Sequence, residues 1–370
     1  MTADSDDMAR IDGQAVALPE AMARAVEILT SARQPLIVGI ATDVAGARAA
    51  LALGAVSGAV VDHVGSEATM SLVLPLQAVG GFVVTPGETR ARADSVLVIG
   101  HSALQIMPDM AQALALAAPP PVAMEPGARR VLHINPGAMP LAGAELAEFT
   151  GLSPLALVSL LSARAQGHRV NALQATLTEG DRVAAWLAAA HYGVIIFNPQ
   201  ELGALAVEAL FRLVALLNRT TRFTALPLVP SASAETFKMV CLWTTGFPGR
   251  VSFVRGAPAY DPELFDAKRM VAHGEADVVL GIDGFGEGLG LPDHALAQIM
   301  LAPCLNGKAR RPEVFIPIGQ PGRDHAGVLF DAATGTLKAM PAAAATSRPS
   351  AAAMLETLRA LALRKGGAPC

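Results

Sequence analysis

The residues best suited to chemistry are gathered in one short stretch, CLWTTGFPGRVSFVRGAPAYDP, which covers residues 241–262. It combines aromatic side chains with two arginines, Arg250 and Arg255, in a chain that is only 4% aromatic. The planar guanidinium group of arginine binds carboxylates through paired hydrogen bonds, so a groove lined by these residues would suit an acidic ligand. Three further cations could line the same groove: Arg222, Lys238 and Arg323. The alternative is that these are solvated surface charges or interface salt bridges.

A second candidate is the glycine-rich loop GFGEGLG at residues 284–290, which follows an apolar run. Glycines after a strand leave backbone N–H groups free to bind a phosphate. The spacing of a dinucleotide-binding loop is not met, because Leu289 stands where the third glycine is required, and Glu287 would repel a phosphate. A plain turn is therefore the favoured interpretation, and a ligand loop is the alternative.

No assembled catalytic set is recognisable elsewhere. Asp62, His63 and Ser66 lie close together without the distant partners of a catalytic triad, which favours an ordinary strand end. The eight histidines show no metal-binding spacing, and His101 is the most site-like because it directly follows a predicted strand. A structural imidazole is the favoured interpretation even there. Two acid/base pairs within single loops are equally unspecific: Asp283 with Glu287, and Asp324 with His325.

The composition favours a protein of the reducing cytoplasm. Three cysteines, Cys241, Cys304 and Cys370, are far apart and form no C-x-x-C pair, so neither a disulfide framework nor a cysteine-rich metal or iron–sulfur site is supported. A net charge of −4 argues against nucleic acid as a partner. Prolines interrupt the apolar runs before the roughly 18 residues that a membrane span needs. Charged residues make up only 16% of the chain, which predicts a large interface with other subunits.

The elements that must position these residues follow an α/β pattern, because short β-branched runs alternate with segments of helical period. Strands are expected at 35–40, 58–64, 95–100, 130–136, 191–197, 276–283 and 314–319. Helices are expected at 18–33, 44–54, 67–79, 107–118, 153–166, 180–190, 203–218, 233–244, 262–273 and 350–364. A rigid exposed link is expected at 118–128, and a second linker at 341–353 leads to a C-terminal helix. In such a fold, ligands bind at the carboxyl ends of the strands.

Residues 243–262 resemble the W-x-T-G-y-P-x-x-V-x-F-x-R-G-x-P-x-Y-x-P motif of the B subunit of formylmethanofuran dehydrogenase, a member of the molybdopterin oxidoreductase superfamily. TPGETRARAD at 85–94 resembles a T-L-G-E-x-x-x-R-A-D element of the same family, and the resemblance spans about residues 18–335. It implies Rossmann-like parallel-sheet lobes of the formate dehydrogenase/DMSO reductase type over residues 18–340, without the iron–sulfur domain. One lobe is expected to be inserted around 86–185. A flexible tail is expected over 1–17, and a linker and C-terminal helix over 341–370.

The departures from that family concern its cofactors. The family's cysteine cluster is absent, and GSEATM at 65–70 stands where a cysteine or selenocysteine would bind tungsten or molybdenum. A soft metal held by pterin dithiolenes prefers a thiolate ligand. The family's G-x-N-P, D-P-R and D-P-G loops are replaced by GHSA, NPG and DGFG. Each lost charge-assisted donor is worth about 1.5–3 kcal/mol. The resemblance therefore implies that the pterin–metal and iron–sulfur sites have been lost.

A chain that keeps the fold of this family but lacks its metal ligands and pterin-binding loops resembles the cofactor-free B subunit of the formyltransferase/hydrolase complexes of methylotrophic bacteria. In these complexes, a formyl group passes from tetrahydromethanopterin to a methanofuran-like carrier and is hydrolysed to formate during formaldehyde oxidation. The other subunits are a zinc amidohydrolase-like subunit, a formyltransferase and one further subunit. The resemblance implies a cytoplasmic, non-catalytic structural subunit that contacts neither nucleic acid nor membrane.

Two alternatives to a structural subunit stay open. One is an active pterin–metal subunit of a formylmethanofuran dehydrogenase that uses an unusual metal ligand such as Ser66. By analogy, Arg255 could lie near a substrate carboxylate or formate in such an enzyme. The other alternative is a module that binds the acidic tail of the carrier, with Arg250 and Arg255 as its contacts.

Overall fold

The chain divides into two compact units that interrupt one another in sequence. The computed structural model describes residues 8–107, 109–122, 127–229, 231–305, 311–344 and 346–366. Unit 1 is built from residues 1–66, 231–330 and 337–370, and unit 2 from residues 67–230 and 331–336. Parts of four predicted segments lie outside the described residues: 1–7 of the tail, residue 108 of the helix expected at 107–118, 123–126 of the first linker, and residues 345 and 367–370 at the C-terminal end.

Unit 1 contains a nine-stranded sheet whose five central strands are parallel. Its order is β11 (Ala259–Tyr260), β10 (Val251–Ser252), β4 (Val60–Val61), β3 (Pro35–Ala41), β12 (Val278–Asp283), β13 (Ala297–Ala302), β14 (Val314–Pro317), β1 (Arg10–Ile11) and β2 (Gln14–Ala15). The outer strands run antiparallel to their neighbours. All seven residues of β3 are buried, as expected for a parallel strand covered on both faces.

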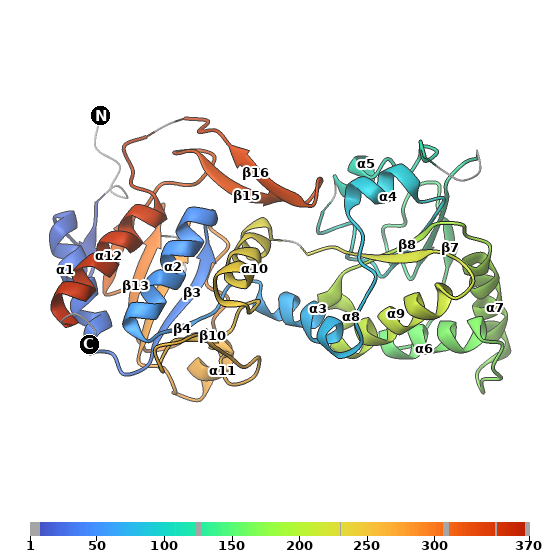
Figure 1. The fold of residues 1–370 in the computed structure, drawn as a ribbon, viewed down its shortest axis with the longest axis horizontal. Coiled ribbons are helices and arrows are strands. Elements are labelled where there is room, and N and C mark those ends of the chain that lie inside the picture. The colour runs from blue at the N-terminus through green and yellow to red at the C-terminus, as the bar shows by residue number, and fades with distance from the viewer. Residues whose placement is uncertain are drawn as a thin grey trace. The chain divides into compact units, whose positions relative to one another are not determined.

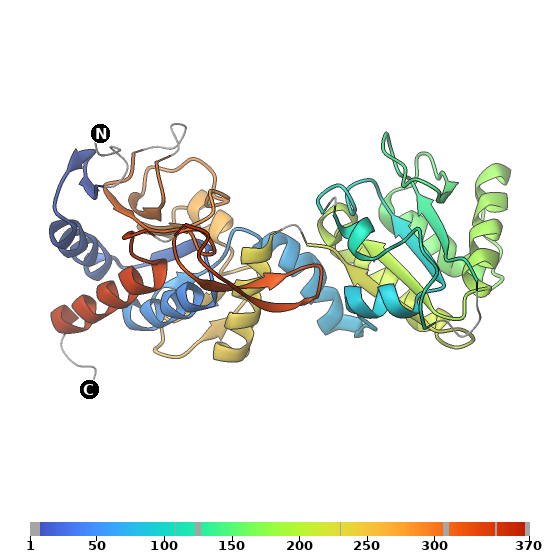
Figure 2. The same cartoon turned by 90° about the horizontal axis from the view of Figure 1, so that it is seen from above.

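Four helices cover one face of this sheet: α1 (Leu18–Ser31), α2 (Val44–Ser57), α10 (Ala232–Thr245) and α12 (Ala351–Gly366). They pack on inward-facing side chains such as Ile37, Leu280 and Ile299. Both views show α12, at the red end of the chain, beside the blue helices α1 and α2 (Figure 1, Figure 2). The opposite face, which includes Leu36 and Val279, packs on α11 (Ala267–Ala272). Unit 1 therefore brings α1 and α12, which are far apart in the sequence, into one core.

Unit 2 contains a five-stranded sheet that is parallel throughout, as expected for strands linked by crossover helices. Its order is β7 (Glu145–Ala147), β6 (Arg130–Ile134), β5 (Ser95–Ile99), β8 (Gly193–Phe197) and β9 (Phe223–Pro227). Alternate residues face opposite sides. Leu97 packs on the side of α3 (Ser66–Val79), α6 (Pro154–Ala165), α7 (Gln174–Ala188) and α9 (Ala204–Leu217), whereas Val96 packs on the side of α5 (Met110–Ala113).

The remaining described elements are short. They are α4 (Pro86–Arg92), α8 (Pro199–Leu202) and a two-stranded sheet of β15 (Gly327–Asp331) and β16 (Thr336–Met340). Among the described residues, no helix combines the length and apolar character that crossing a membrane requires.

The α/β class with parallel sheets agrees with the prediction, and each of the seven predicted strand regions contains an observed strand. Two expected helices have other bounds: that at 262–273 is only α11, Ala267–Ala272, and that at 180–190 is α7, Gln174–Ala188. Three further expectations differ from the structure. Residues 10–15 form β1 and β2, and β1 pairs with β14, so this segment does not belong to a flexible tail over 1–17. The inserted unit spans 67–230 and is wider than 86–185, because α9 and β9 complete its core. The helix expected at 107–118 is reduced to the single turn of α5.

Candidate functional site

The aromatic and arginine-rich stretch at 241–262 forms the end of α10 and the edge hairpin of β10 and β11. Gly246 ends the helix in the left-handed conformation with φ 84°, which glycine adopts without steric cost. The rings of Phe247 and Tyr260 then stack with centroids 5.3 Å apart. Trp243, by contrast, is 53% exposed. The middle of the stretch, residues 248–253, is buried, whereas residues 242–244 and 254–258 on either side of it are exposed.

Arg250 is buried between two carboxylates. It is only 6% exposed, and its φ of 48° lies in the left-handed region, which costs a non-glycine residue about 1–3 kcal/mol. Its Nη2 lies 2.5 Å from Oδ2 of Asp266, and its Nε lies 3.8 Å from Oδ2 of Asp62. Its Nη1 donates a hydrogen bond to the carbonyl of Pro262. The guanidinium is thus engaged inside unit 1.

Arg255 lies in a different environment on the same hairpin. Its side chain is exposed, and within the described residues its guanidinium makes no hydrogen bond or ion pair. The other predicted cations are likewise dispersed. Lys238 is bound to Glu235 at 2.5 Å, whereas Arg222 is a residue of unit 2 and Arg323 an exposed residue of unit 1. Arg250 and Arg255, the two residues predicted to contact the carrier, therefore differ in accessibility. The guanidinium of Arg255 is available to an outside ligand, and that of Arg250 is not.

Asp62, at the carboxyl end of β4, organises the loop that stands where the metal ligand was expected. It is 2% exposed, and its carboxylate accepts hydrogen bonds from Ser66 Oγ at 3.2 Å and from the backbone N–H of Ala267 at 3.1 Å. Gly65 packs so tightly that an added Cβ would lie 2.5 Å from Cβ of Ala234. Ser66 is therefore held by an internal hydrogen bond in a tightly packed loop.

The glycine-rich loop after β12 is also closed by internal carboxylates. Asp283 accepts hydrogen bonds from the N–H groups of Glu287 and Gly288 at 2.8 and 2.9 Å. Glu287 in turn accepts hydrogen bonds from the hydroxyls of Ser231 and Ser233, at 2.7 and 2.9 Å, at the N-terminal end of α10. A helix N-terminus favours negative charge, and here the negative charge comes from the protein itself. The favoured interpretation of 284–290 as a turn agrees with this geometry.

Unit 2 repeats this arrangement at the end of β5. Glu201, from α8, accepts hydrogen bonds from the consecutive N–H groups of His101 and Ser102, at 2.9 and 3.0 Å, and from the Ser102 hydroxyl at 2.6 Å. Nδ1 of His101 lies 2.6 Å from the same carboxylate. Asn198 donates a hydrogen bond to the Ser102 hydroxyl at 2.8 Å. Consecutive N–H groups form an anion-binding concavity, and Glu201 fills it.

His133, at the end of β6, is a structural imidazole. Its Nε2 donates to the Gly100 carbonyl at 2.8 Å, and its Nδ1 accepts from the N–H of Leu141 at 3.2 Å, which fixes a neutral tautomer. Burial lowers the pKa of this imidazole. Sequence reasoning missed His133 and Glu201, although both lie in or beside strand exits that it singled out.

Two further strand exits in unit 1 carry internal carboxylates. Asp43, after β3, accepts a hydrogen bond from the N–H of Gly46 at 2.9 Å and caps α2. Asp324, after β14, accepts from the N–H of Gln320 at 2.8 Å. Both side chains are buried. Backbone donors that could serve an anionic ligand are therefore satisfied within the chain at these exits too.

No family model matches the chain. The B subunit of the formyltransferase/hydrolase complex Fhc from Methylorubrum extorquens is 29% identical over 369 residues, which covers 96% of this chain and 98% of that protein. A chain in the crystal structure of the formyltransferase/hydrolase complex FhcABCD from the same organism, in complex with methylofuran, matches with a TM-score of 0.87. That match is 29% identical and covers 97% of this chain and 99% of the other. The chain is a homologue of the Fhc B subunit.

This homologue of the Fhc B subunit is also related to a redox enzyme subunit. The B subunit of tungsten-containing formylmethanofuran dehydrogenase 2 from Methanocaldococcus jannaschii is 26% identical over 326 residues, covering 81% of this chain and 70% of that protein. The corresponding protein of Methanococcus maripaludis is 24% identical over 321 residues, with the same coverage. The mixed α/β fold with parallel sheets matches the structure of the formyltransferase/hydrolase chain.

The residues of this homologue do not fit a tungsten centre. Residues 65–70 offer no thiolate and no imidazole, and the Ser66 hydroxyl donates to Asp62. Within the described ranges, no group of three or more His, Cys, Asp or Glu side chains is arranged to hold a metal ion. Cys241 is buried, and burial raises the pKa of its thiol to about 12, which disfavours the thiolate that a soft metal needs.

Proposed function

We propose that this chain is a non-catalytic structural subunit of a cytoplasmic formyltransferase/hydrolase complex. Such a complex transfers a formyl group from tetrahydromethanopterin to a methanofuran-like carrier and hydrolyses it to formate during formaldehyde oxidation. The partners would be a zinc amidohydrolase-like subunit, a formyltransferase subunit and one further subunit. The similarity to the Fhc B subunit over almost the whole of both chains supports membership in such a complex.

The observation that carries the structural role is the closure of the strand exits by internal carboxylates. In this proposal, the two units are lobes of the molybdopterin oxidoreductase type in which Glu201 and Glu287 occupy anion-binding loops. A pterin nucleotide brings phosphate groups, which would have to displace these carboxylates and face their charge. Each displaced hydrogen bond to a charged group is worth about 1.5–3 kcal/mol. The fold is kept while its cofactor-binding capacity is lost.

Copurification with metal analysis tests this proposal. The chain is expressed with the other three subunits of its complex, and the purified assembly is assayed for tungsten, molybdenum and formate-dependent dye reduction. We expect a stable assembly with formyl transfer and hydrolysis, and neither metal in proportion to this chain. Stoichiometric tungsten or molybdenum, or dye reduction by formate, would instead establish the active pterin–metal subunit. Failure of the chain to copurify would refute membership in the complex.

A second candidate function is contact with the acidic part of the carrier. It is favoured by the exposed guanidinium of Arg255, which makes no ion pair within the described part of the chain. Arg250 would then act as a positioning residue, because its own guanidinium is held by Asp62 and Asp266.

The test of this second function is the affinity of the assembled complex for methylofuran with Arg255→Ala, and with Arg48→Ala as a matched exposed control on α2. We expect about tenfold weaker binding for Arg255→Ala alone, because one charge-assisted contact is lost. Equal affinities would remove Arg255 from the binding site.

A further inference from the structure

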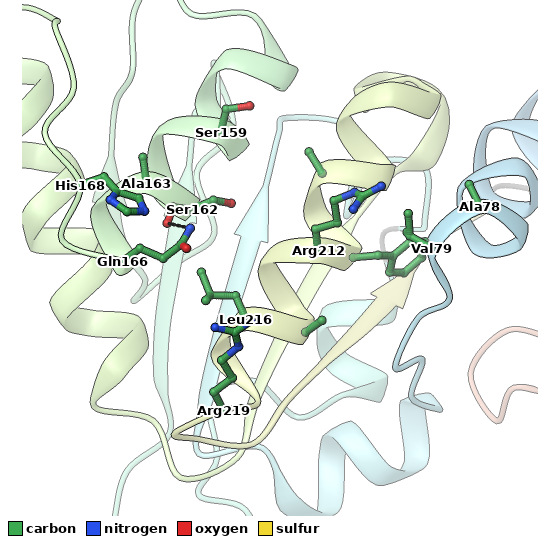
Figure 3. A pocket seen from close by; sticks show the side chains of 13 residues that line it. Ala78, Val79, Ser159, Ser162, Ala163, Gln166, His168, Arg212, Leu216 and Arg219 are labelled. Carbon is green, nitrogen blue, oxygen red and sulfur yellow. Dashed lines mark hydrogen bonds between the residues drawn. The ribbon is translucent and has the colours of Figure 1, made fainter.

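Unit 2 carries an open groove that none of the roles above uses. It has a volume of about 700 Å³ and lies between α6 and α9, beside the end of α3 (Figure 3). Small side chains of the two facing helices, including Ser159, Ala163 and Ala215, leave the space between them. Val79 and Leu216 supply apolar contacts within it. The groove therefore combines an apolar lining with access from solvent.

The ionisable side chains among the described residues that line the groove are two arginines and one histidine. Arg212 and Arg219 come from the α9 side, whereas His168 follows the end of α6 (Figure 3). No aspartate or glutamate is found among these described lining residues. Arg212 shares its guanidinium with Glu208 at 2.9 Å, but within the described ranges Arg219 and His168 have no side-chain hydrogen bond or ion pair. The groove thus presents two arginines, of which Arg212 is shared with Glu208 and Arg219 is available to a negative partner.

We propose that this groove binds an extended acidic segment of a partner polypeptide. Arg212 lies in α9, and Arg219 lies in the turn two residues past its last residue, Leu217. A rise of 1.5 Å per residue, as in a helix, separates the two by roughly 10 Å. In an extended segment, side chains two and four residues apart project to the same side at about 7 and 13 Å. These spacings bracket the separation of the arginines, and flexible arginine side chains take up the difference. The apolar lining accommodates the side chains between the carboxylates.

The openness of the groove distinguishes a peptide from a small molecule. Sites for small ligands bury about 70–90% of the ligand surface. Here Ser159, Gln166, Arg212 and Arg219 are themselves accessible to solvent, so a small anion would keep much of its surface in water. A polypeptide segment gains instead from several contacts made along the groove. This inference concerns unit 2 alone and stands independently of the proposed function.

Fluorescence anisotropy with the full-length chain tests the proposal. The probe is a fluorescein-labelled peptide with glutamate at every second position and alanine or leucine between, compared with the same peptide carrying glutamine. We expect binding of the glutamate peptide that weakens with added salt. The double variant Arg212→Ala/Arg219→Ala should bind about tenfold more weakly or worse. Arg90→Ala, an exposed arginine of α4 outside the groove, should bind like the wild type.

Unchanged circular dichroism and thermal unfolding of the double variant will show that it folds, since both arginines are exposed. Equal binding of the wild type and the double variant would overturn the proposal, as would equal binding of the glutamate and glutamine peptides. Succinate or inorganic phosphate that binds as tightly as the peptide would assign the groove to small anions instead. These results leave metal content and copurification unaffected, so the proposed function is tested separately.

Discussion

Replacing Arg250 with alanine should destabilise unit 1 by removing the cation between two carboxylates. Asp62, which is 2% exposed, would then lose its arginine and keep its hydrogen bonds to Ser66 and Ala267, with the His63 imidazole 3.7 Å away as its remaining ionisable neighbour. Breaking a buried ion pair from one side costs about 3–5 kcal/mol, because the remaining charge stays out of water. Asp266 adds less, since its side chain is 20% exposed. Alanine keeps the left-handed backbone, so the substitution does not relieve that strain.

The loss is a large part of the stability of an ordinary domain, which is about 5–15 kcal/mol. For a unit of this size, each kcal/mol shifts the melting temperature by about 2–4 °C, so the transition of unit 1 should fall by roughly 6–20 °C. Calorimetry is the suitable assay, because a chain of two units need not unfold in one step. Arg255→Ala is the matched control, since that arginine is exposed and should change the transition little.

A double variant isolates the charge effect. Asp62→Asn in the Arg250→Ala background removes the stranded charge and should recover about 1–2 kcal/mol, which a double-mutant cycle measures. If Arg250→Ala is as stable as the Arg255→Ala control, the ion pairs contribute nothing and the reasoning is wrong. If Asp62→Asn recovers no stability in the Arg250→Ala background, the loss has a cause other than the uncompensated carboxylate.

Three further predictions concern single groups. Because burial raises the pKa of Cys241 to about 12, iodoacetamide at pH 8 should label the exposed Cys304 and leave Cys241 unmodified, as peptide mapping will show. Burial lowers the pKa of His133 in the folded state, so as the pH falls the unfolded chain binds this proton before the folded chain does, and stability should decrease below about pH 6.5. In the His133→Gln variant, the melting temperature should change less between about pH 7.5 and 5.5 than it does in the wild type. Glu287→Gln removes the charge that holds residues 284–290 to α10, so amide hydrogen exchange in this loop should accelerate. The free energy of unfolding should fall by only about 1 kcal/mol. Unchanged amide exchange in the loop would contradict this role of Glu287.

The sequence pattern predicts the fold best where strands are apolar on both faces. The runs at 35–40 and 95–100 match β3 and β5 closely, because continuous burial leaves only one sensible assignment. The pattern fails at the sheet edges. β1 and β2 lie in a polar segment, and the strand form of β1 depends on pairing with β14, which is about 300 residues away. Such pairing is a tertiary effect that local composition does not carry.

The sequence predicts which loops carry the candidate site, but it does not predict the hydrogen bonds and ion pairs that its side chains make. Glu287 was recognised as unfavourable to phosphate, and the structure adds that it binds Ser231 and Ser233. The hydrogen bonds of Glu201 to His101 and Ser102 require β5 and β8 to be neighbours, and strand order cannot be read from local periodicity. For the same reason, sequence alone could not separate the engaged Arg250 from the exposed Arg255.

The insertion of unit 2 also has a consequence for synthesis of the chain. β3 ends at Ala41, and its neighbour β12 ends at Asp283, 242 residues later. At about 5–20 residues per second, the ribosome takes roughly 12–50 s to supply that neighbour. The apolar run at 35–41 therefore leaves the ribosome long before its sheet can be completed, whereas almost all of unit 2 is translated within that interval. Protection of the nascent chain by chaperones should matter most for its first 66 residues.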